Sequence, residues 1–238
     1  MNRILFEPEE IDGDTAVATG ARAEHIAKVL HGEIGQVLKT GVVGGKIGSG
    51  TITGLGSGRV TLEVNHSEES LRPWCDLILA PPRPRILKRL LPQLSTLGVG
   101  NIVLVGAKKT EKDFWGATLL KPENHRPLFI DGAMQAGTSH LPELLVRRNF
   151  RAFLEEELDA MFPTGNRIVA HPYLKTEVPP DVLAERQLFA VGPEGGWTDA
   201  EVALLSARGF RGLSLGARIL RTDTALIALL SRFLPPAI

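Results

Sequence analysis

Two glycine-rich turns near the C-terminal end constrain the fold of this chain more than any other feature. The first turn spans 192–196 and the second spans 215–221. Each follows a short apolar run that is typical of a buried strand, and each precedes a helical pattern. In open α/β sheets, ligands bind at the carboxyl ends of the strands. We therefore expect the two turns to face each other across one ligand pocket.

The composition narrows the range of functions. The 238 residues carry 27 basic and 27 acidic side chains, so a polyanionic partner requires a local basic patch. The single cysteine, Cys75, excludes a disulfide framework within the chain, and the six histidines lack metal-ligand spacing, so no metal is expected. The first residues lack an apolar signal core and no apolar run reaches membrane-spanning length, which predicts a cytoplasmic protein.

Residues 1–70 are predicted to form a small β domain. Apolar and polar residues alternate over 60–65, as in a half-buried strand, and 36–40 and 46–53 are two further candidate strands. The glycines of 44–51 lack the residue order of a phosphate-binding loop, and no helical pattern follows them. They therefore predict a hairpin turn.

A short amphipathic helix and a linker complete this first region. The helix is expected over 24–30, with Ile26, Val29 and Leu30 facing the sheet. The polar segment 67–73 ends in proline and is a candidate linker.

From residue 74 to 238 strands and helices alternate, which predicts an α/β domain with a parallel sheet. The expected strands are 77–80, 102–105, 167–170, 188–191 and 212–215. The expected helices are 84–97, 123–136, 150–161, 198–209 and one that begins near 222. Pro92 should kink the first of these helices. Thr198 and Glu201 form a capping box, and Thr222 or Asp223 should cap the last helix.

The first turn carries an acidic side chain among its glycines. Glu194 either lies in solvent beside a tight strand-to-helix connection or faces a ligand. Helix N-termini attract anions, but a carboxylate at this position repels a phosphate. A ligand with a positive charge fits this turn better.

The second turn combines close backbone approach with apolar and cationic side chains. Gly216 permits a ligand to approach the main chain, and the apolar pair Ile219 and Leu220 could enclose a flat ring. Arg221 stands at the start of the last helix, where the helix dipole disfavours a cation. This unfavourable placement indicates a functional role for Arg221, with a solvated arginine as the alternative.

The two turns resemble the knotted methyltransferase superfamily that uses S-adenosylmethionine. The similar motifs are Gly192-Pro-Glu-Gly-Gly196 and Leu215-Gly-Ala-Arg-Ile-Leu-Arg-Thr-Asp-Thr-Ala225. Within that superfamily the chain resembles the bacterial ribosomal RNA small-subunit methyltransferase E family, which methylates N3 of a uridine in 16S rRNA. The similarity covers nearly the whole chain, with weaker matches at Arg3, 25–30 and Gly35.

The resemblance implies an α/β fold with a trefoil-knotted SPOUT methyltransferase domain over 74–238. It implies a PUA-like β-barrel over 1–70 that helps to hold RNA, and a homodimer that packs through the knot region. S-adenosylmethionine would lie bent across the two turns. The implied cofactor-binding residues are His171, Gly192, Pro193, Glu194, Gly195, Gly196, Leu215, Gly216, Arg218, Ile219 and Leu220.

For a uridine N3 target, a nearby cation would stabilise the negative charge that develops on the ring. Arg221 is the predicted catalytic residue, and His171 and Glu194 are candidate general bases.

Basic side chains cluster near the start of the first α/β helix and after the next strand, and could contact RNA phosphates. The predicted RNA-binding residues are Arg3, Arg83, Arg85, Lys88, Arg89, Lys108 and Lys109.

Several positions on the substrate side depart from the family's usual motifs. The segment 107–110 is Ala-Lys-Lys-Thr in place of Ser-Glu-Arg-Ser, and 134–138 lacks the usual Glu-Gln-x-x-Arg pattern. Thr96 replaces a glutamate and His31 replaces an arginine. Two alternatives therefore stay open: a diverged paralogue that methylates another RNA nucleotide, and a non-catalytic RNA-binding protein. A Rossmann-type enzyme is disfavoured because no G-x-G-x-x-G motif follows an early strand.

Overall fold

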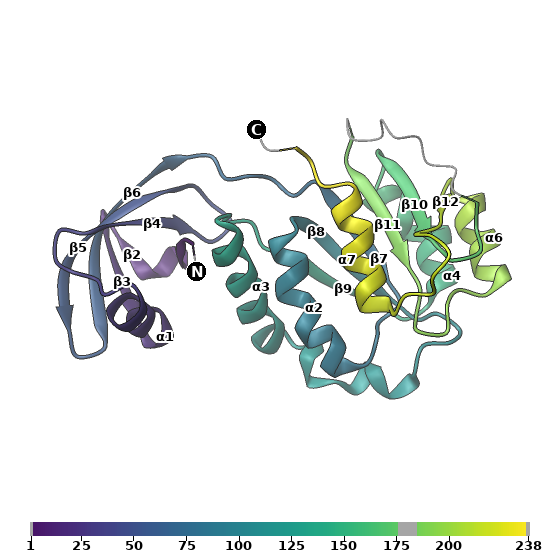
Figure 1. Cartoon of the computed structure of the whole chain (residues 1–238), viewed down its shortest axis with the longest axis horizontal. Helices are drawn as coiled ribbons and strands as arrows, with labels where there is room; N and C mark the ends of the chain where they lie inside the picture. The colour runs from purple at the N-terminus through teal and green to yellow at the C-terminus, as the bar shows by residue number, and fades with distance from the viewer. Residues whose placement is uncertain (1, 176–184, 237–238) are drawn as a thin grey trace. The chain divides into compact units, whose positions relative to one another are not determined.

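The computed structural model describes residues 2–175 and 185–236 (Figure 1). The chain forms two compact units, Met1–Arg72 with Phe129–Leu141 and Pro73–Leu128 with Pro142–Ile238. The division near residue 72 lies close to the expected linker, but 129–141 packs with the first unit and not with the second. The reason is local: Ala133 and Met134 are buried in the first core, and the Met134 carbonyl accepts hydrogen bonds from the amides of Asn2 and Arg3.

A six-stranded sheet forms the first unit, in the order β1-β4-β5-β6-β3-β2. Its strands are β1 (Ile4–Phe6), β2 (Ile11–Asp12), β3 (Thr15–Thr19), β4 (Val37–Val42), β5 (Ile47–Gly56) and β6 (Arg59–Glu68). Only the β1–β4 pair is parallel among these strands. The predicted strands at 36–40, 46–53 and 60–65 are confirmed. The predicted hairpin turn is confirmed too, because β4 and β5 pair antiparallel across it.

The helix of the first unit differs from the prediction. It consists of α1 (Gly20–Glu24) and a π-helical turn, η2 (His25–Val29), after the short 3₁₀ turn η1 (Pro8–Glu10). Ile26 is fully buried, as predicted, and Leu30 packs against the core, whereas Val29 is 60% exposed. The Leu30 amide donates to the His25 carbonyl at 3.0 Å, five residues back. This wider turn rotates Val29 away from the buried face.

The second unit is built on a parallel sheet in the order β12-β10-β11-β7-β8-β9. Its strands are β7 (Cys75–Leu79), β8 (Val99–Val105), β9 (Glu143–Arg147), β10 (Asn166–Ala170), β11 (Gln187–Val191) and β12 (Arg211–Leu213). All five strands predicted for this region are confirmed, within three residues at their ends. The edge strand β9 was not predicted; its side chains are only partly buried, so it lacks a strong apolar run.

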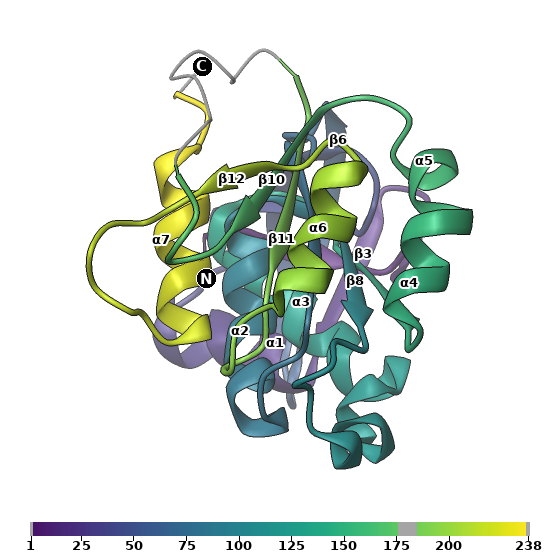
Figure 2. The same ribbon diagram turned by 90° about the vertical axis from the view of Figure 1, so that its right-hand side faces the viewer.

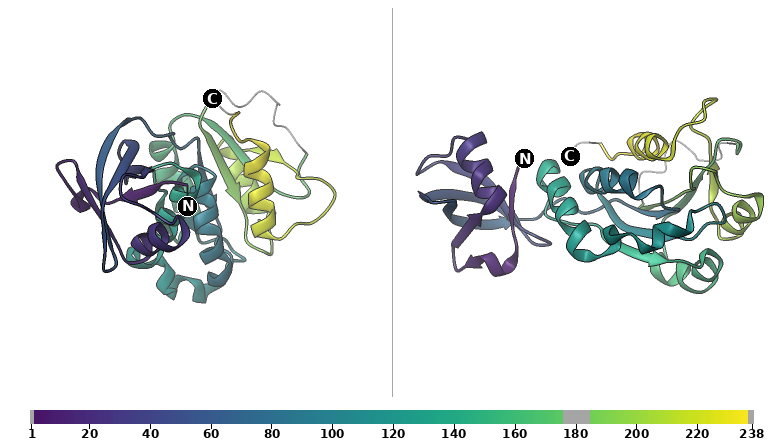
Figure 3. Two further views of the ribbon diagram at one scale, coloured as in Figure 1. Left: turned by 60° about the vertical axis from the view of Figure 1, so that its left-hand side comes forward. Right: turned by 90° about the horizontal axis from the view of Figure 1, so that it is seen from below.

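Helices cover both faces of this sheet. The helical elements that follow β7 are α2 (Pro84–Thr96), η3 (Lys112–Gly116), η4 (Thr118–Leu120), α3 (Pro122–Ala136), α4 (Phe150–Ala152), η5 (Phe153–Glu157), α5 (Leu158–Met161), α6 (Asp199–Ala207) and α7 (Thr222–Arg232). Of these, α3 runs from the second unit into the segment Phe129–Leu141 of the first. The helices α2 and α7 lie on one face, and α4, α5 and α6 on the other (Figure 2; Figure 3, right). Among the described residues no helix combines the length and the apolar character needed to cross a membrane.

Side chains of β11 alternate between the two helical layers. Phe189 packs against Phe233 at the end of α7, with ring centroids 5.5 Å apart. Leu188 and Ala190 belong to the core cluster of the opposite layer, which includes Phe150 and Trp197. Burial on both faces explains the continuous apolar run in the sequence. Because all strands are parallel, the turns that follow β10, β11 and β12 meet at one edge of the sheet.

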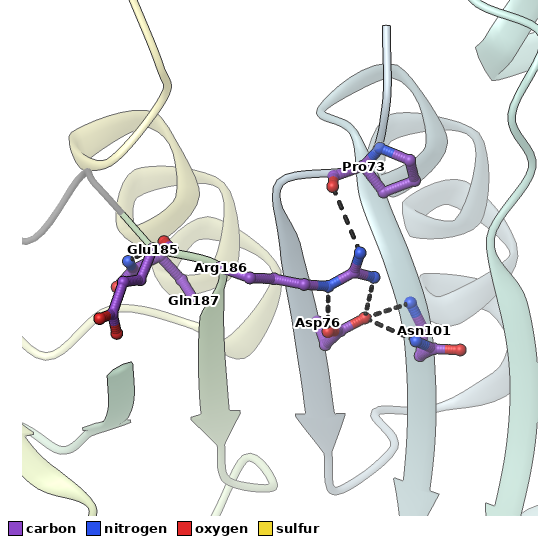
Figure 4. A network of polar contacts seen from close by, with 6 residues as sticks. All are labelled: Pro73, Asp76, Asn101, Glu185, Arg186 and Gln187. Atoms are coloured by element: carbon purple, nitrogen blue, oxygen red, sulfur yellow. Dashed lines mark hydrogen bonds and ion pairs between the residues drawn. The ribbon is translucent and has the colours of Figure 1, made fainter. Parts of the chain in front are cut away.

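An ion pair ties the strands together at the opposite, amino edge (Figure 4). Asp76, buried at the start of β7, receives two hydrogen bonds from Arg186, from Nε to Oδ2 at 2.6 Å and from Nη2 to Oδ1 at 2.7 Å. The Asn101 amide and side chain also donate to Oδ1. The carboxylate therefore joins β7, β8 and the segment that enters β11.

The capping predictions have opposite outcomes. At α6, the Thr198 hydroxyl accepts from the Glu201 amide and the Glu201 carboxylate accepts from the Thr198 amide, which confirms the capping box. At α7, the prediction of Thr222 or Asp223 is wrong, because the N-cap residue is Arg221. The described contacts include no side-chain hydrogen bond from Arg221 to this helix end.

Candidate functional site

A cavity of about 460 Å³ opens at the carboxyl edge of the parallel sheet. Segments that follow β10, β11 and β12 contribute its walls, and the start of α7 closes it. The eleven residues predicted to bind a cofactor all line it. They are His171, Gly192, Pro193, Glu194, Gly195, Gly196, Leu215, Gly216, Arg218, Ile219 and Leu220. The structure thus brings the two glycine-rich turns together across one cavity.

The first turn is fixed by close backbone packing. The Gly196 amide donates to the Pro193 carbonyl at 2.8 Å, and Gly196 has a φ of +70°, which favours glycine. A Cβ on Gly192 would lie 3.1 Å from the Trp197 amide nitrogen and 3.2 Å from its ring. Trp197 is in turn stacked on Phe150, with ring centroids 5.1 Å apart. The core therefore holds this stretch of main chain in place.

The second turn is more open. The chain leaves β12, arcs outward and enters α7 (Figure 2). Gly216 has a φ of +111°, and a Cβ there would have no heavy atom within 4 Å among the described residues outside its own neighbourhood. Ile219 is 73% exposed although it is strongly apolar. Bare main chain and an exposed apolar side chain at one cavity wall leave this turn accessible to a ligand.

His171 belongs to a third wall, formed by the end of β10. Its amide donates to the Leu213 carbonyl at 3.0 Å, and its Nδ1 accepts from the Tyr173 amide at 3.3 Å. The Ser214 hydroxyl links this wall to the second turn by donating to the Pro172 carbonyl at 3.2 Å. His171 therefore shapes the cavity wall through backbone contacts.

Lys109 lines this cavity as well, although the sequence placed it only among RNA-binding residues. Its Nζ donates to the Gly195 carbonyl at 2.7 Å, and its aliphatic chain packs against Gly195. Sequence spacing could not reveal this contact, because β7 lies between β8 and β11 in the sheet. The only available hint was that Lys109 follows a buried strand at its carboxyl end.

Arg221 is absent from the described residues that line the cavity, although both of its chain neighbours belong to them. Its side chain is 71% exposed, and its Nε lies 3.7 Å from Asp223 Oδ1. Arg89 on α2 pairs with the other carboxylate oxygen of Asp223 at 3.2 Å. Asp223 therefore pairs with two arginines beside the cavity. Arg221 belongs to this basic surface and not to the cavity lining.

The other predicted RNA-binding residues occupy different environments. Arg85, Lys88 and Lys108 are exposed, and Arg83 forms an exposed ion pair with Glu111.

Arg3 lies in a more buried environment, among carbonyl groups of the first unit. Its guanidinium donates from Nε to the Gly137 carbonyl and from Nη1 to the carbonyls of Thr40 and Gly48. Burial lowers the pKa of Arg3 below its ordinary value, and the opposing effect of the negative charge on Glu68 is smaller. Arg3 thus joins two strands and the 129–141 segment inside the first unit.

A parallel α/β unit with a main-chain-lined cavity at the carboxyl ends of its strands has the architecture of a small-ligand-binding domain. In the described part of the chain, no three His, Cys, Asp or Glu side chains are grouped to hold a metal. Comparison with known proteins assigns the chain to a narrower class. Residues 69–234 match the model of the RNA methyltransferase domain.

Relatives match over nearly the full length. A ribosomal RNA small subunit methyltransferase E of Treponema pallidum is 32% identical over 237 residues, which cover 96% of this chain and 88% of the relative. A methyltransferase of Legionella pneumophila, solved with its bound cofactor S-adenosylmethionine, is 25% identical with a TM-score of 0.75, covering 97% of this chain and 95% of that one. A ribosomal RNA small subunit methyltransferase E of Neisseria gonorrhoeae shares the fold, with 23% identity and a TM-score of 0.75. The match covers 97% of this chain and 95% of that one. This chain belongs to the RNA methyltransferase family, and within it to the ribosomal RNA small subunit methyltransferase E group.

Proposed function

We propose that this protein transfers a methyl group from S-adenosylmethionine to N3 of a uridine in 16S rRNA of the small ribosomal subunit. The observation that carries the proposal is the single cavity enclosed by both glycine-rich turns in a chain of this family. The cavity of about 460 Å³ is ordinary for a site that holds a cofactor-sized ligand, for which about 300–1,000 Å³ is typical.

The walls of the cavity suit this donor. Gly196 and Gly216 expose main chain where a Cβ would project into open space. The Glu194 carboxylate complements a positive charge, and Ile219 with Leu220 offers apolar cover for a flat ring. When bound, S-adenosylmethionine supplies an activated methyl group on a cationic sulfur. The protein's task is to align the two reactants and exclude water.

We propose that the first unit is a PUA-like barrel that holds RNA, and that the last strands and the last helix form a trefoil knot. We also propose a homodimer that packs through the knotted region, and action in the cytoplasm on ribosomal RNA or the small subunit. For the RNA surface we propose the exposed residues Arg83, Arg85, Lys88, Arg89, Lys108 and Arg221.

Methylation of small subunits that lack the modification tests the function. We expect purified protein with isotope-labelled S-adenosylmethionine to label 16S rRNA as 3-methyluridine, measured by mass spectrometry of the nucleosides. Label on another nucleotide would favour a diverged paralogue, which the altered segments 107–110 and 134–138 keep open. RNA binding without any label would make the protein a non-catalytic RNA-binding protein.

A further inference from the structure

A second, smaller cavity adjoins the first in the same unit. It has a volume of about 40 Å³ and lies beside the carboxyl ends of β7 and β8. Three residues line both cavities: Lys109, Pro193 and Glu194. The remaining lining residues are Pro81, Pro82, Arg83, Pro84, Thr110, Glu111 and Phe114. The two cavities therefore share one wall.

The shape of the second cavity limits what it can hold. Since one water-sized group needs roughly 10–15 Å³, the cavity has room for a few such groups, and not for a nucleotide. Its buried residues Pro81, Pro82 and Phe114 provide rigid apolar surface. This combination fits the edge of one flat ring whose sugar and phosphate stay outside.

Thr110 belongs to the lining of the second cavity and carries a buried polar atom. The Thr110 Oγ1 atom is buried and has no hydrogen-bond partner among the described residues. A buried hydroxyl left in this state is costly unless a ligand or water satisfies it. At the rim, Arg83 and Glu111 pair with each other at 3.4 Å and are exposed. A heterocycle with carbonyl and N–H groups would satisfy Thr110.

The shared wall carries a cation and a carboxylate. Lys109 is held against this wall by its bond to the Gly195 carbonyl. Glu194 lines both cavities, whereas His171 lines only the first among the described residues, and Arg221 lines neither. Lys109 and Glu194 are thus the titratable groups that can act on a ring in the second cavity and face the donor in the first.

We propose that the second cavity receives one edge of the extruded target base, that Lys109 stabilises the negative charge of that base, and that Glu194 accepts its N3 proton. This inference rests on the proposed function and assigns to Lys109 the role that the sequence suggested for Arg221. Enzymes that modify a base commonly take it out of the stack into a fitted pocket. The Thr110 hydroxyl would bind a polar group of the same ring.

With Glu194 and Lys109 in these roles, every proton and electron pair of the methyl transfer is accounted for. The N3–H bond breaks and its proton goes to the Glu194 carboxylate, which leaves the electron pair on N3. That pair forms the bond to the methyl carbon as the carbon–sulfur bond breaks, and the electrons of the broken bond remain on sulfur. Glu194 is exposed and returns the proton to solvent. Lys109 offsets the negative charge of the ring before and during attack.

Lys109→Gln tests the cationic role. We expect the turnover of RNA methylation to fall by about 10²–10³, the usual effect of removing one charge-stabilising donor. The dissociation constant of S-adenosylmethionine, measured by calorimetry, should change by no more than about threefold. Lys109→Arg should recover part of the turnover. The matched control is Lys121→Gln, an exposed lysine of the same unit, which should keep the parental rate.

Two outcomes would overturn the role of Lys109. Parental turnover in Lys109→Gln would show that the cation is not needed. A loss of donor binding as large as the loss of turnover would make Lys109 only a brace of the Gly195 turn. Either result leaves the proposed function intact, provided that the parent protein methylates RNA. If the parent labels no RNA, the proposed function itself fails.

Glu194→Gln tests the proton acceptor. We expect turnover to fall by about 10²–10⁴, as for loss of a general base. With the base removed, the residual rate should rise with pH because the N3 proton must then leave to hydroxide or water. Parental turnover with an unchanged pH profile would exclude Glu194 as the acceptor.

Discussion

At the scale of single residues, the cavity depends on main chain that side chains leave uncovered. Gly216 combines a φ of +111° with open space at the position of its missing Cβ, so replacement has both a conformational and a steric consequence. Gly209, at the end of α6, has a φ of +80° and equally open surroundings. It is not among the described residues that line the cavity, which makes it a matched comparison.

We expect Gly216→Ala to weaken S-adenosylmethionine binding at least tenfold, or about 1.4 kcal/mol, because the methyl group projects into the ligand's space. Both Gly216→Ala and Gly209→Ala should lower the free energy of unfolding by about 1–3 kcal/mol through backbone strain. Calorimetry should show the loss of affinity in the first variant alone. Equal affinities in the two variants would contradict a ligand at this turn.

His66 makes the first unit sensitive to pH. Burial lowers the pKa of His66 below its ordinary value of 6.5, and the nearby positive charge of Arg3 lowers it further. The unfolded chain then binds the proton more readily than the folded chain. This contribution to stability is complete above the unfolded pKa and is lost as the pH falls below about 6.5 toward the folded pKa.

We therefore expect the free energy of unfolding, measured by denaturant titration, to fall between pH 7.5 and pH 5.5 in the parent protein. His66→Gln should reduce that fall, because glutamine does not titrate. If the two proteins lose stability equally over this range, the depressed pKa of His66 is not the cause.

At the scale of elements, α6 shows how a local sequence signal fixes one wall of the cavity. Its capping box joins Thr198 and Glu201, and the second Glu201 oxygen accepts the Lys108 amide at 2.7 Å. One carboxylate thus holds both the helix start after the first turn and the loop that carries Lys109. The helix end and this loop are positioned together.

We expect Thr198→Ala to lower the free energy of unfolding by about 1 kcal/mol, the usual effect of losing an N-cap side chain. Ser206→Ala, at an exposed position near the other end of α6, should be nearly neutral. Thermal unfolding of the two variants provides the measurement. An unchanged Tm for Thr198→Ala would show that the capping box contributes little.

At the scale of the whole molecule, the formal net charge is zero, but basic side chains are concentrated on one local surface. Arg85 and Lys88 are exposed on α2, and Arg89 and Arg221 converge on Asp223 near the cavity. Since the formal net charge is zero, attraction of RNA depends on this local arrangement and is screened by salt.

We expect the double variant Arg85→Gln, Lys88→Gln to bind RNA more weakly. Its plot of log affinity against log salt should be shallower by about 1.4–1.8, or roughly 0.7–0.9 for each lost phosphate contact. Lys121→Gln with Arg151→Gln removes the same charge elsewhere in the unit and should leave the slope unchanged. A filter-binding series over salt concentration measures both, and equal slopes in the two double variants would contradict this surface.

The sequence predicted the parallel strands and the family because these depend on local patterns. Continuous apolar runs gave β7, β8, β10, β11 and β12, and the family motifs at 192–196 and 215–225 are uninterrupted in the chain. The relationship that they indicated is confirmed by the matching family model. Both turns were predicted to share a cavity, and they do.

What the sequence could not predict depends on contacts between distant segments. Lys109 reaches the first turn across β7, Arg3 is occupied by carbonyls from three separate segments, and 129–141 joins the first core. Val29 was misplaced because a π-helical turn interrupts the expected periodicity. In each case the decisive partner lies far along the chain or the local hydrogen bonding departs from the regular pattern.

Main chain from the two glycine-rich turns binds a methyl donor beside the cavity that takes the edge of an RNA base, in the function that we propose. A crystal structure of the protein with S-adenosylmethionine tests it most directly. We expect density for the donor between 192–196 and 215–220, with its methyl group directed at the wall formed by Lys109, Pro193 and Glu194. An empty cavity at saturating donor, or density for the donor at a different surface, would contradict it.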